Sequence, residues 1–511
     1  MRDFSFLRLE IRLLIKYHKN NQLIGIDLCT LVYYNITINL VVKKNKNAKW
    51  GGIMEQKKFN YDYSKTPWMK MFLAKPDWEK NTSDVLINFE QALEIIRMMD
   101  NITQGIQKIV YLVGWQGLGH DDCYPEMEVI NPYLKRDCDA TPRESFMWLF
   151  EEAKKYNTVI SVHGNLADEY EANQSHPEFV EANAITKYPD GTPAIIEVFY
   201  GRNAYKTSYK QYWESGLFKK YFDRFCEVIP VREAGTIHLD NFCIAENFGP
   251  RTEMHEQDEA RNKMLDYIID LGIDVTSEYT YREMPLRSES NHPIRKYYEK
   301  CGAKIVDTDW RDAPIRTLGR VPAVWWMSNI TIDDCINIPA SEFSGYCNIE
   351  AIRNVVYGTV HGEDIWMNNG IEKDVWVPMY IKQFCTMQMP YTYLNRYERL
   401  SYTGNAEDGY VVTFSDGVET CGNSLSITKN GIELKKGYDV ILPLTEDNKT
   451  FIAYSENGKN GEWNVPDAEF EKAKVYNITA DGNEYIFDVT VKDEKISLNL
   501  AAGQAVAVVA Q

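Results

Sequence analysis

The sequence predicts an α/β fold in which a (β/α)8 TIM-like barrel is followed by a C-terminal antiparallel β-sandwich. From about residue 69 to residue 388, short β-rich runs alternate with longer amphipathic stretches, which is typical of a parallel sheet with helical crossovers. The run at residues 109–115, IVYLVGW, is apolar almost throughout, which indicates burial on both faces. Neither a glycine-rich dinucleotide motif nor a P-loop occurs, so a nucleotide-binding fold lacks support.

The barrel elements follow from this alternation. We expect strands at residues 70–74, 108–115, 158–163, 236–242, 274–279, 304–308 and 323–327. We expect helices at residues 83–99, 142–156, 210–228, 257–271 and 292–301.

After residue 392 the pattern changes to short alternating runs separated by Asp-Gly and Asn-Gly turns, which indicates antiparallel strands. These runs lie at residues 411–414, 432–434, 440–444, 451–454, 474–478, 485–491 and 505–509.

The chain therefore divides into a catalytic barrel at residues 54–392 and a sandwich at residues 393–511. Residues 1–53 differ in composition and lack turn residues. The codons for Trp50–Met54 would place a G-rich run just before an ATG, as in a bacterial ribosome-binding site. We expect translation to start at Met54 and residues 1–53 to be a spurious extension; a genuine N-terminal strand pair is the alternative.

Composition narrows the class of protein. The 511 residues carry 56 Lys and Arg against 74 Asp and Glu, a net charge of −18, so a nucleic-acid partner is not expected. No apolar stretch is long enough to predict a membrane span. The ten cysteines form no C-x-x-C pair, and together with the lack of a signal peptide they favour a cytoplasmic location. Oligomeric state is not predictable from the sequence.

Carboxylates follow two successive strands of the predicted barrel. Asp240 ends the fourth strand and Glu278 the fifth, and strand ends of a barrel share one face. Cleavage of a glycosidic bond needs two such groups, one ionised and one acting as a proton donor. Asp240 lies among polar neighbours, which favours a nucleophile, whereas two tyrosines flank Glu278, which favours the acid. A helix cap or turn is the alternative for Asp240; the rivals for the acid are Asp307, Asp309, Glu246 and Glu363.

Other strand ends carry side chains suited to binding sugar hydroxyls. His120 and Asp121 offer a donor and an acceptor, and Trp115 offers an apolar ring face; a loop hydrogen-bond network around a buried Trp115 is the alternative. His163 and Asn165 end the third strand, where a core histidine is an equal alternative. We add Asp309, Trp310 and Trp326 as substrate-binding candidates, with core packing as the alternative for the tryptophans.

Three stretches of this chain resemble glycoside hydrolase family 101, the endo-α-N-acetylgalactosaminidases. The stretches are Tyr111–Gln116 with Gly119–Asp122 and Tyr124-Pro125; Tyr393–Arg396 through Phe414–Gly417; and Ile452–Ser455 with Trp463 and Pro466.

The resemblance implies a retaining enzyme with Asp240 as nucleophile, Glu278 as acid/base, and His120 and Asp121 in the N-acetylgalactosamine subsite. Leu239–Phe242 departs from the usual family sequence, and the chain lacks large flanking carbohydrate-binding modules. A related α-N-acetylgalactosaminidase such as glycoside hydrolase family 129 is therefore the second match.

We thus expect a retaining glycoside hydrolase that cleaves α-linked N-acetylgalactosamine, or the core-1 disaccharide, from O-glycans or glycopeptides. A catalytically silent carbohydrate-binding protein, and an α-galactosidase or α-glucanase of the same fold, stay open. No cofactor is predicted. A structural Ca²⁺ at carboxylates such as Asp364 stays open, although no Ca²⁺-binding loop motif supports it.

Overall fold

The computed structural model describes residues 60–62, 65–199, 201–240, 242, 247–248, 251–252, 254–277, 366, 370–405, 409–422 and 424–511. Residues 60–511 form one compact unit. The elements predicted at residues 292–301, 304–308 and 323–327 lie outside the described residues, as do Glu278, Asp309, Trp310 and Trp326.

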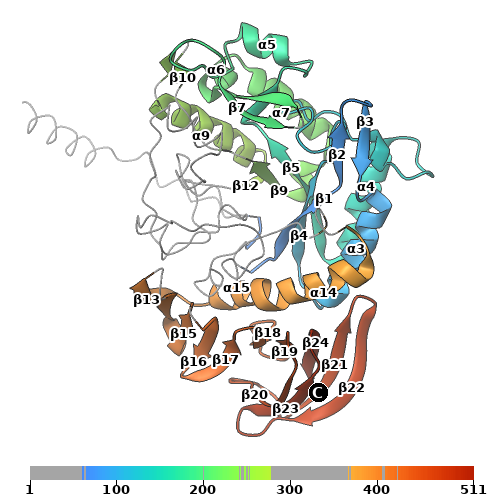
Figure 1. Ribbon diagram of the computed structural model, residues 1–511, viewed down its shortest axis with the longest axis vertical. Helices are drawn as coiled ribbons and strands as arrows, with labels where there is room; N and C mark the ends of the chain where they lie inside the picture. Colours follow the sequence, from blue (N-terminus) through green and yellow to red (C-terminus); the bar gives the residue numbers. More distant parts are fainter. Residues whose placement is uncertain are drawn as a thin grey trace, which may run out of the picture. The chain divides into compact units, whose positions relative to one another are not determined.

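A parallel sheet forms the first part of this unit (Figure 1). Its strands occur in chain order as β1 (Trp68–Phe72), β4 (Lys108–Val113), β5 (Thr158–Asn165), β9 (Thr236–Asp240) and β12 (Asp274–Ser277). All four neighbouring pairs are parallel, and all six residues of β4 are buried, as expected for a sheet covered on both faces. The predicted parallel sheet is confirmed, while closure into an eight-stranded barrel stays a prediction.

The first crossover helix begins later than the predicted residue 83. Residues 82–85 form β3 (Thr82–Val85), which pairs with β2 (Ala74–Asp77) in a hairpin. Helix α3 then spans Phe89–Ile102, because Asn88 and Gln91 form a reciprocal capping box that fixes its start.

The remaining crossovers are also helical. Helix α4 (Pro142–Ala153) continues into the 3₁₀ turn η2 (Lys154–Tyr156) and contacts both α3 and β5. The helix predicted at residues 210–228 is two helices, α6 (Tyr209–Glu214) and α7 (Leu217–Val228). They are separated by Gly216, whose φ of +80° lies outside the helical region. The longest described helix is α9 (Met254–Asp270), and the short elements are α5 (His176–Glu181), α8 (Val231–Ala234) and η1 (Pro132–Leu134).

Two small sheets interrupt the alternation where the sequence predicts loops. Strands β6 (Asp168–Tyr170), β8 (Arg202–Lys206) and β7 (Ile195–Phe199) form an antiparallel sheet inserted between β5 and α6. Strands β10 (Asn247–Phe248) and β11 (Arg251–Thr252) form a short hairpin.

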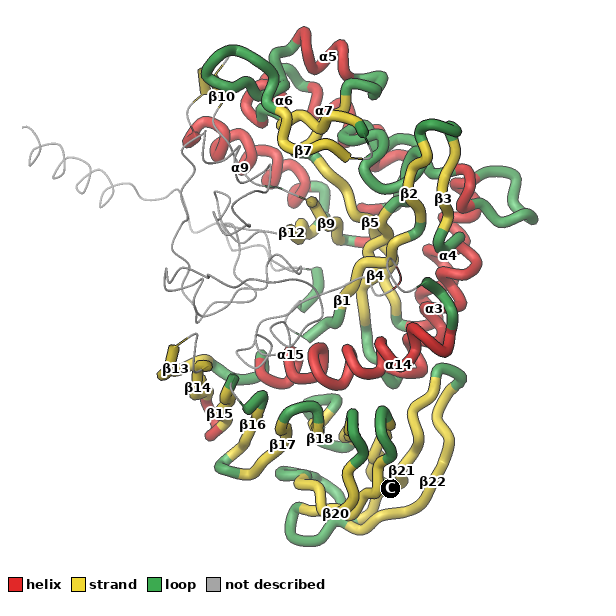
Figure 2. Tube along the Cα trace, in the orientation of Figure 1, coloured by secondary structure: helices red, strands yellow, loops and turns green. Residues whose placement is uncertain are grey.

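A helical segment precedes the C-terminal strands in the chain (Figure 2). It comprises α14 (Lys373–Gln383), the π-helical turn η5 (Phe384–Gln388) and α15 (Met389–Leu394). The segment contacts β18 and β19 of the C-terminal sheet.

The C-terminal part consists of a ten-stranded antiparallel sheet and a two-stranded ribbon. Two close turns, at Asp416-Gly417 and Asn430-Gly431, carry a positive-φ residue before a glycine, which is the turn geometry that the sequence predicts. The large sheet runs in the order β13 (Arg399–Asn405), β14 (Gly409–Phe414), β15 (Val418–Cys421), β16 (Ser426–Lys429), β17 (Ile432–Lys436), β18 (Asp439–Pro443), β19 (Thr450–Ser455), β24 (Gln504–Ala510), β21 (Lys472–Thr479) and β22 (Gly482–Thr490).

The ribbon of β20 (Lys459–Asn464) and β23 (Lys495–Leu500) shares a hydrophobic cluster with the large sheet, including Trp463 and Phe451. The antiparallel sheet is thus present, and its arrangement as a sandwich stays a prediction. Within the described part of the chain, every helix is too short or too polar to cross a membrane.

Gly114 sets the direction in which the chain leaves β4. Its φ is +73°, and a Cβ atom there would lie 2.2 Å from the carbonyl oxygen of Ala74. Gly105 is a matched control, because its φ is +74° and no other heavy atom lies within 4 Å of an added Cβ. In both alanine variants the left-handed backbone conformation lowers the free energy of unfolding by about 1–2 kcal/mol.

We expect Gly114→Ala to lower the free energy of unfolding by about 2 kcal/mol more than Gly105→Ala, because only Gly114→Ala also forces the backbone of β2 to move. Urea unfolding of both variants measures the difference. Equal losses would contradict the close approach.

Candidate functional site

The carboxyl ends of β5 and β9 bring the predicted site residues together. In the register of this pair, His163 lies opposite His238, and Asn165 lies opposite Asp240. Because side chains alternate along a strand, His163 and Asn165 share one face of β5. The strand-end residues His163, Asn165 and Asp240 therefore form one polar group.

The loop after β4 adds His120 and Asp121 to this group. The backbone N–H of His120 donates to the carbonyl of Ala74 at 2.9 Å, which holds the loop against β2. His120 Nδ1 lies 2.7 Å from Asp121 Oδ2, and the side chain of Asp121 is only 2% exposed. The rings of His120 and His163 lie next to one another, with centroids 5.6 Å apart.

Asn165 orients the carboxylates through the oxygen and the nitrogen of its side-chain amide. Its Oδ1 accepts hydrogen bonds from the backbone N–H groups of Ala167 and Asp168, at 2.7 and 3.0 Å. Its Nδ2 therefore points to the carboxylates and donates to Asp168 Oδ2 at 2.7 Å and to Asp240 Oδ2 at 3.4 Å. His163 Nε2 lies 3.6 Å from the same Asp240 oxygen.

Asp240 is the more accessible of the two carboxylates that Asn165 contacts. Its side chain is 18% exposed, whereas Asp168 is buried. Burial raises the pKa of Asp168 to about 7, the charges of Asp240 and Asp121 add to this rise, and Lys206 opposes it. Asp168 therefore holds a proton over much of the range in which an exposed carboxyl is ionised.

Two histidines, His163 and His238, are held neutral. Burial lowers the pKa of His163 to about 3, and the positive charge of Lys70 adds to that effect. Burial likewise lowers the pKa of His238, whose Nδ1 lies 2.8 Å from the hydroxyl of Thr276. Lys70 and Lys206 are themselves buried, so the site combines two buried cations with several carboxylates.

Trp115 does not present a ring face to this site, in contrast to the sequence prediction. Its side chain is fully buried, its Nε1–H donates to the carbonyl of His163 at 2.9 Å, and its ring packs against Phe146 and Phe225. Gly114, immediately before it, turns the chain with a positive φ. Trp115 thus supports the end of β5 from the core.

Sequence reasoning missed Lys70, Asp168 and Lys206. Lys70 had a signal, because it is a lone charge inside the buried strand β1. Asp168 and Lys206 pair across β6 and β8 of the inserted sheet, and no local pattern indicates that this insertion returns to the strand ends.

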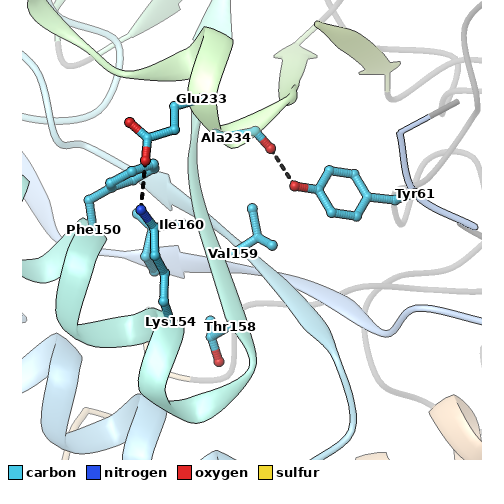
Figure 3. A pocket seen from close by; sticks show the side chains of 8 residues that line it. All are labelled: Tyr61, Phe150, Lys154, Thr158, Val159, Ile160, Glu233 and Ala234. Atoms are coloured by element: carbon cyan, nitrogen blue, oxygen red, sulfur yellow. Dashed lines mark hydrogen bonds and ion pairs between the residues drawn. The ribbon is translucent and has the colours of Figure 1, made fainter.

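A pocket at the opposite edge of the parallel sheet is separate from this group (Figure 3). Thr158 at the start of β5, and Ala234 just before β9, line it together with Tyr61. Lys154 and Glu233 form an ion pair of 2.7 Å at its rim. Parallel α/β sheets bind their ligands at the carboxyl ends of the strands, so this pocket is not the candidate active site.

Asp168 predicts a pH dependence of stability. Between its unfolded pKa of 3.8 and its folded pKa of about 7, the unfolded chain releases the proton that the folded chain retains. The contribution of this group to stability therefore falls as the pH rises through this window. Asp168→Asn cannot titrate, so its stability relative to the unmodified protein should increase by about 2–3 kcal/mol from pH 4.5 to pH 7 and then level off.

Urea unfolding across this pH range measures the effect. Asp139→Asn is the control, because its partner Arg136 lowers the pKa of Asp139 to about 2 and its titration lies below the window. A difference between Asp168→Asn and the unmodified protein that stays constant with pH would contradict the raised pKa.

A comparison with models of protein families indicates the class of protein. Residues 81–294 match the model of a glycoside hydrolase family. This range includes His120, Asp121, His163, Asn165, Asp240 and Glu278. The family is glycoside hydrolase family 101, described as endo-α-N-acetylgalactosaminidase, and the resemblance predicted from the sequence is confirmed. No curated protein matches the chain.

Similar solved structures include the ligand-free α-N-acetylgalactosaminidase NagBb from Bifidobacterium bifidum, with 14% identity and a TM-score of 0.46. That match covers 71% of this chain and 57% of NagBb, so the chain spans less than two thirds of its length. An α-amylase from Geobacillus thermoleovorans matches with 9% identity and a TM-score of 0.39, over 87% of this chain and 98% of the amylase.

Proposed function

We propose that this protein is a retaining glycoside hydrolase that cleaves α-linked N-acetylgalactosamine, or the core-1 disaccharide, from O-glycans or glycopeptides. The observation that carries the proposal is the position of Asp240, a partly exposed carboxylate at the carboxyl end of β9 and within hydrogen-bond distance of Asn165. The match to family 101 over residues 81–294 supports the same class of reaction.

Asp240 is the nucleophile in this proposal. One of its carboxylate oxygens attacks the anomeric carbon as the glycosidic bond breaks, which forms a covalent glycosyl-enzyme. Asn165 donates to Oδ2 of Asp240 and so holds the carboxylate in one orientation. The neutral ring of His163 adds no charge that would weaken the nucleophile.

Glu278 is the acid/base. It follows β12, which pairs directly with β9, so the two carboxyl groups come from neighbouring strand ends. Glu278 first gives its proton to the departing oxygen and then takes a proton from the water that releases the sugar from Asp240. The side chain of Glu278 lies outside the described residues, so this role rests on the sequence.

His120 and Asp121 bind the sugar. Asp121 is a buried carboxylate with His120 as its neighbour at 2.7 Å, so it accepts hydrogen bonds from sugar hydroxyls in a fixed orientation. His120 is 20% exposed and is the more accessible of the pair. Asp309, Trp310 and Trp326 stay candidate contacts. A cytoplasmic location and the domain boundaries at residues 54 and 393 stay predictions.

A panel of aryl α-glycosides tests the proposal. We expect turnover of aryl α-N-acetylgalactosaminide or of the aryl core-1 disaccharide, with the α-anomer of the released sugar as the first product in NMR. If the β-anomer is released first, the enzyme inverts the anomeric configuration instead of retaining it. Sugar binding without turnover, at equal affinity in Asp240→Asn, would favour a catalytically silent carbohydrate-binding protein instead.

A further inference from the structure

His120, His163 and Asp240 bring three potential metal-ligand atoms together. These atoms lie within 4.8 Å of one another, although the residues come from the loop after β4, the end of β5 and the end of β9. In the described part of the chain, this is the group of three His, Cys, Asp or Glu side chains with such spacing. The cluster joins two imidazoles to one carboxylate.

His120 is oriented as a metal ligand. Its Nδ1 lies 2.7 Å from Asp121 Oδ2, an ion-pair distance that is not aligned as a hydrogen bond, which leaves Nε2 as the ring nitrogen for the ion. A carboxylate that holds the other ring nitrogen is the usual companion of a metal-binding histidine, because it fixes the tautomer and strengthens the ligand.

His163 has ring nitrogens that the described structure does not otherwise use. The side chain is 1% exposed, and neither nitrogen has a hydrogen-bond partner among the described residues. A buried polar group without a partner is costly, on the order of 1–3 kcal/mol. Its Nε2 points to Asp240 Oδ2 at 3.6 Å.

The spacing and ligand types indicate the class of ion. Two ligands at about 2.0–2.1 Å from a tetrahedral zinc ion are about 3.3 Å apart, close to the His163–Asp240 separation. Two histidines and one carboxylate form a ligand set of catalytic zinc sites, whereas Ca²⁺ and Mg²⁺ prefer oxygen ligands. His120 and Asp240 are partly exposed, which leaves a path for the ion and an open fourth position.

The surrounding charges are mixed. The buried carboxylate of Asp121 favours a cation, and the buried Lys70 and Lys206 oppose it. Because Asp121 is the residue in direct contact with a ligand, its charge acts at the shortest distance.

We propose that His120, His163 and Asp240 bind a divalent transition-metal ion of the Zn²⁺ class, with a water molecule at the fourth position. The ion takes up the carboxylate oxygen that would otherwise attack a substrate, so it competes with glycosides; this inhibition, unlike the binding itself, rests on the proposed function.

Cobalt binding tests the site without any need for turnover. The full chain is titrated with Co²⁺ at pH 7.5, and the visible absorption of a tetrahedral Co²⁺ centre is recorded. We expect one equivalent to bind and Zn²⁺ to displace it. His120→Gln and Asp240→Asn should each weaken binding by at least about tenfold, and Asp121→Asn by about 10–100-fold through the orientation of His120.

His176→Gln is the matched control. His176 also faces a buried carboxylate, with Nδ1 2.8 Å from Glu169 Oε2, but it lies outside the cluster. Its Co²⁺ affinity should equal that of the unmodified protein. Circular dichroism shows whether each variant is folded.

Two results would overturn the proposal: no Co²⁺ or Zn²⁺ binding by the folded protein at millimolar metal, or unchanged affinity in both His120→Gln and Asp240→Asn. Failure of the proposed function can be distinguished from failure of the metal site, because a protein that is inactive on every aryl glycoside would still bind Co²⁺ through these residues. If the enzyme is active, Zn²⁺ should raise KM with kcat unchanged, and EDTA should reverse this effect.

Discussion

Asp240→Asn should lower kcat/KM for an aryl α-N-acetylgalactosaminide by about a thousandfold or more, with the fold intact. The amide has nearly the shape of the carboxylate but cannot form the glycosyl-enzyme, and loss of a nucleophile commonly costs several orders of magnitude in rate. Steady-state kinetics measure the loss, and circular dichroism checks the fold.

The control for this variant is Asp488→Asn, an exposed position on β22 in the C-terminal sheet. It makes the same chemical change away from the candidate site and should keep full activity. If Asp240→Asn retained more than about a tenth of the activity, the nucleophile would have to be another residue.

Trp115→Ala should lower the free energy of unfolding by about 3–5 kcal/mol, the usual cost of removing a large aromatic side chain from a core. The fully buried ring packs against Phe146 and Phe225, and the deletion leaves a cavity that close-packed neighbours fill only in part. Denaturant unfolding followed by tryptophan fluorescence and circular dichroism measures the loss.

Trp115→Phe separates packing from the hydrogen bond. It keeps an aromatic ring but loses the Nε1–H that donates to the carbonyl of His163, so we expect a smaller loss of about 1–2 kcal/mol. If Trp115 instead formed a sugar platform, the alanine variant would keep its stability and raise KM.

The strands of the parallel sheet were predictable because they are short runs rich in apolar and β-branched residues. Residues 108–113 and 158–163 needed only that pattern. The start of α3 was not predictable from the sequence. The short polar hairpin of β2 and β3 has no alternating apolar pattern, and several polar residues before Asn88 could equally have served as the helix cap. Strand β23 alternates clearly, but its pairing with β20 depends on the tertiary fold.

The site was predictable where it depends on strand ends. His163, Asn165 and Asp240 meet because parallel strands place their carboxyl ends at one edge, a property that the chain order alone implies. Trp115 was misjudged because the same rule places a residue near the edge without saying which way its side chain points. Asp168 and Lys206 depend on how an inserted sheet folds back, which is a matter of long-range packing.

Strand β24 has a consequence for how the C-terminal part assembles. It lies between β19 and β21, and it pairs with both. The seven strands from β13 to β19 and the hairpin of β21 and β22 are thus joined in this sheet only through Gln504–Ala510. Until β24 has been synthesised, the edges of β19 and β21 with which it pairs have no partner in this sheet. A nascent chain halted before residue 504 would therefore expose both edges to other strands.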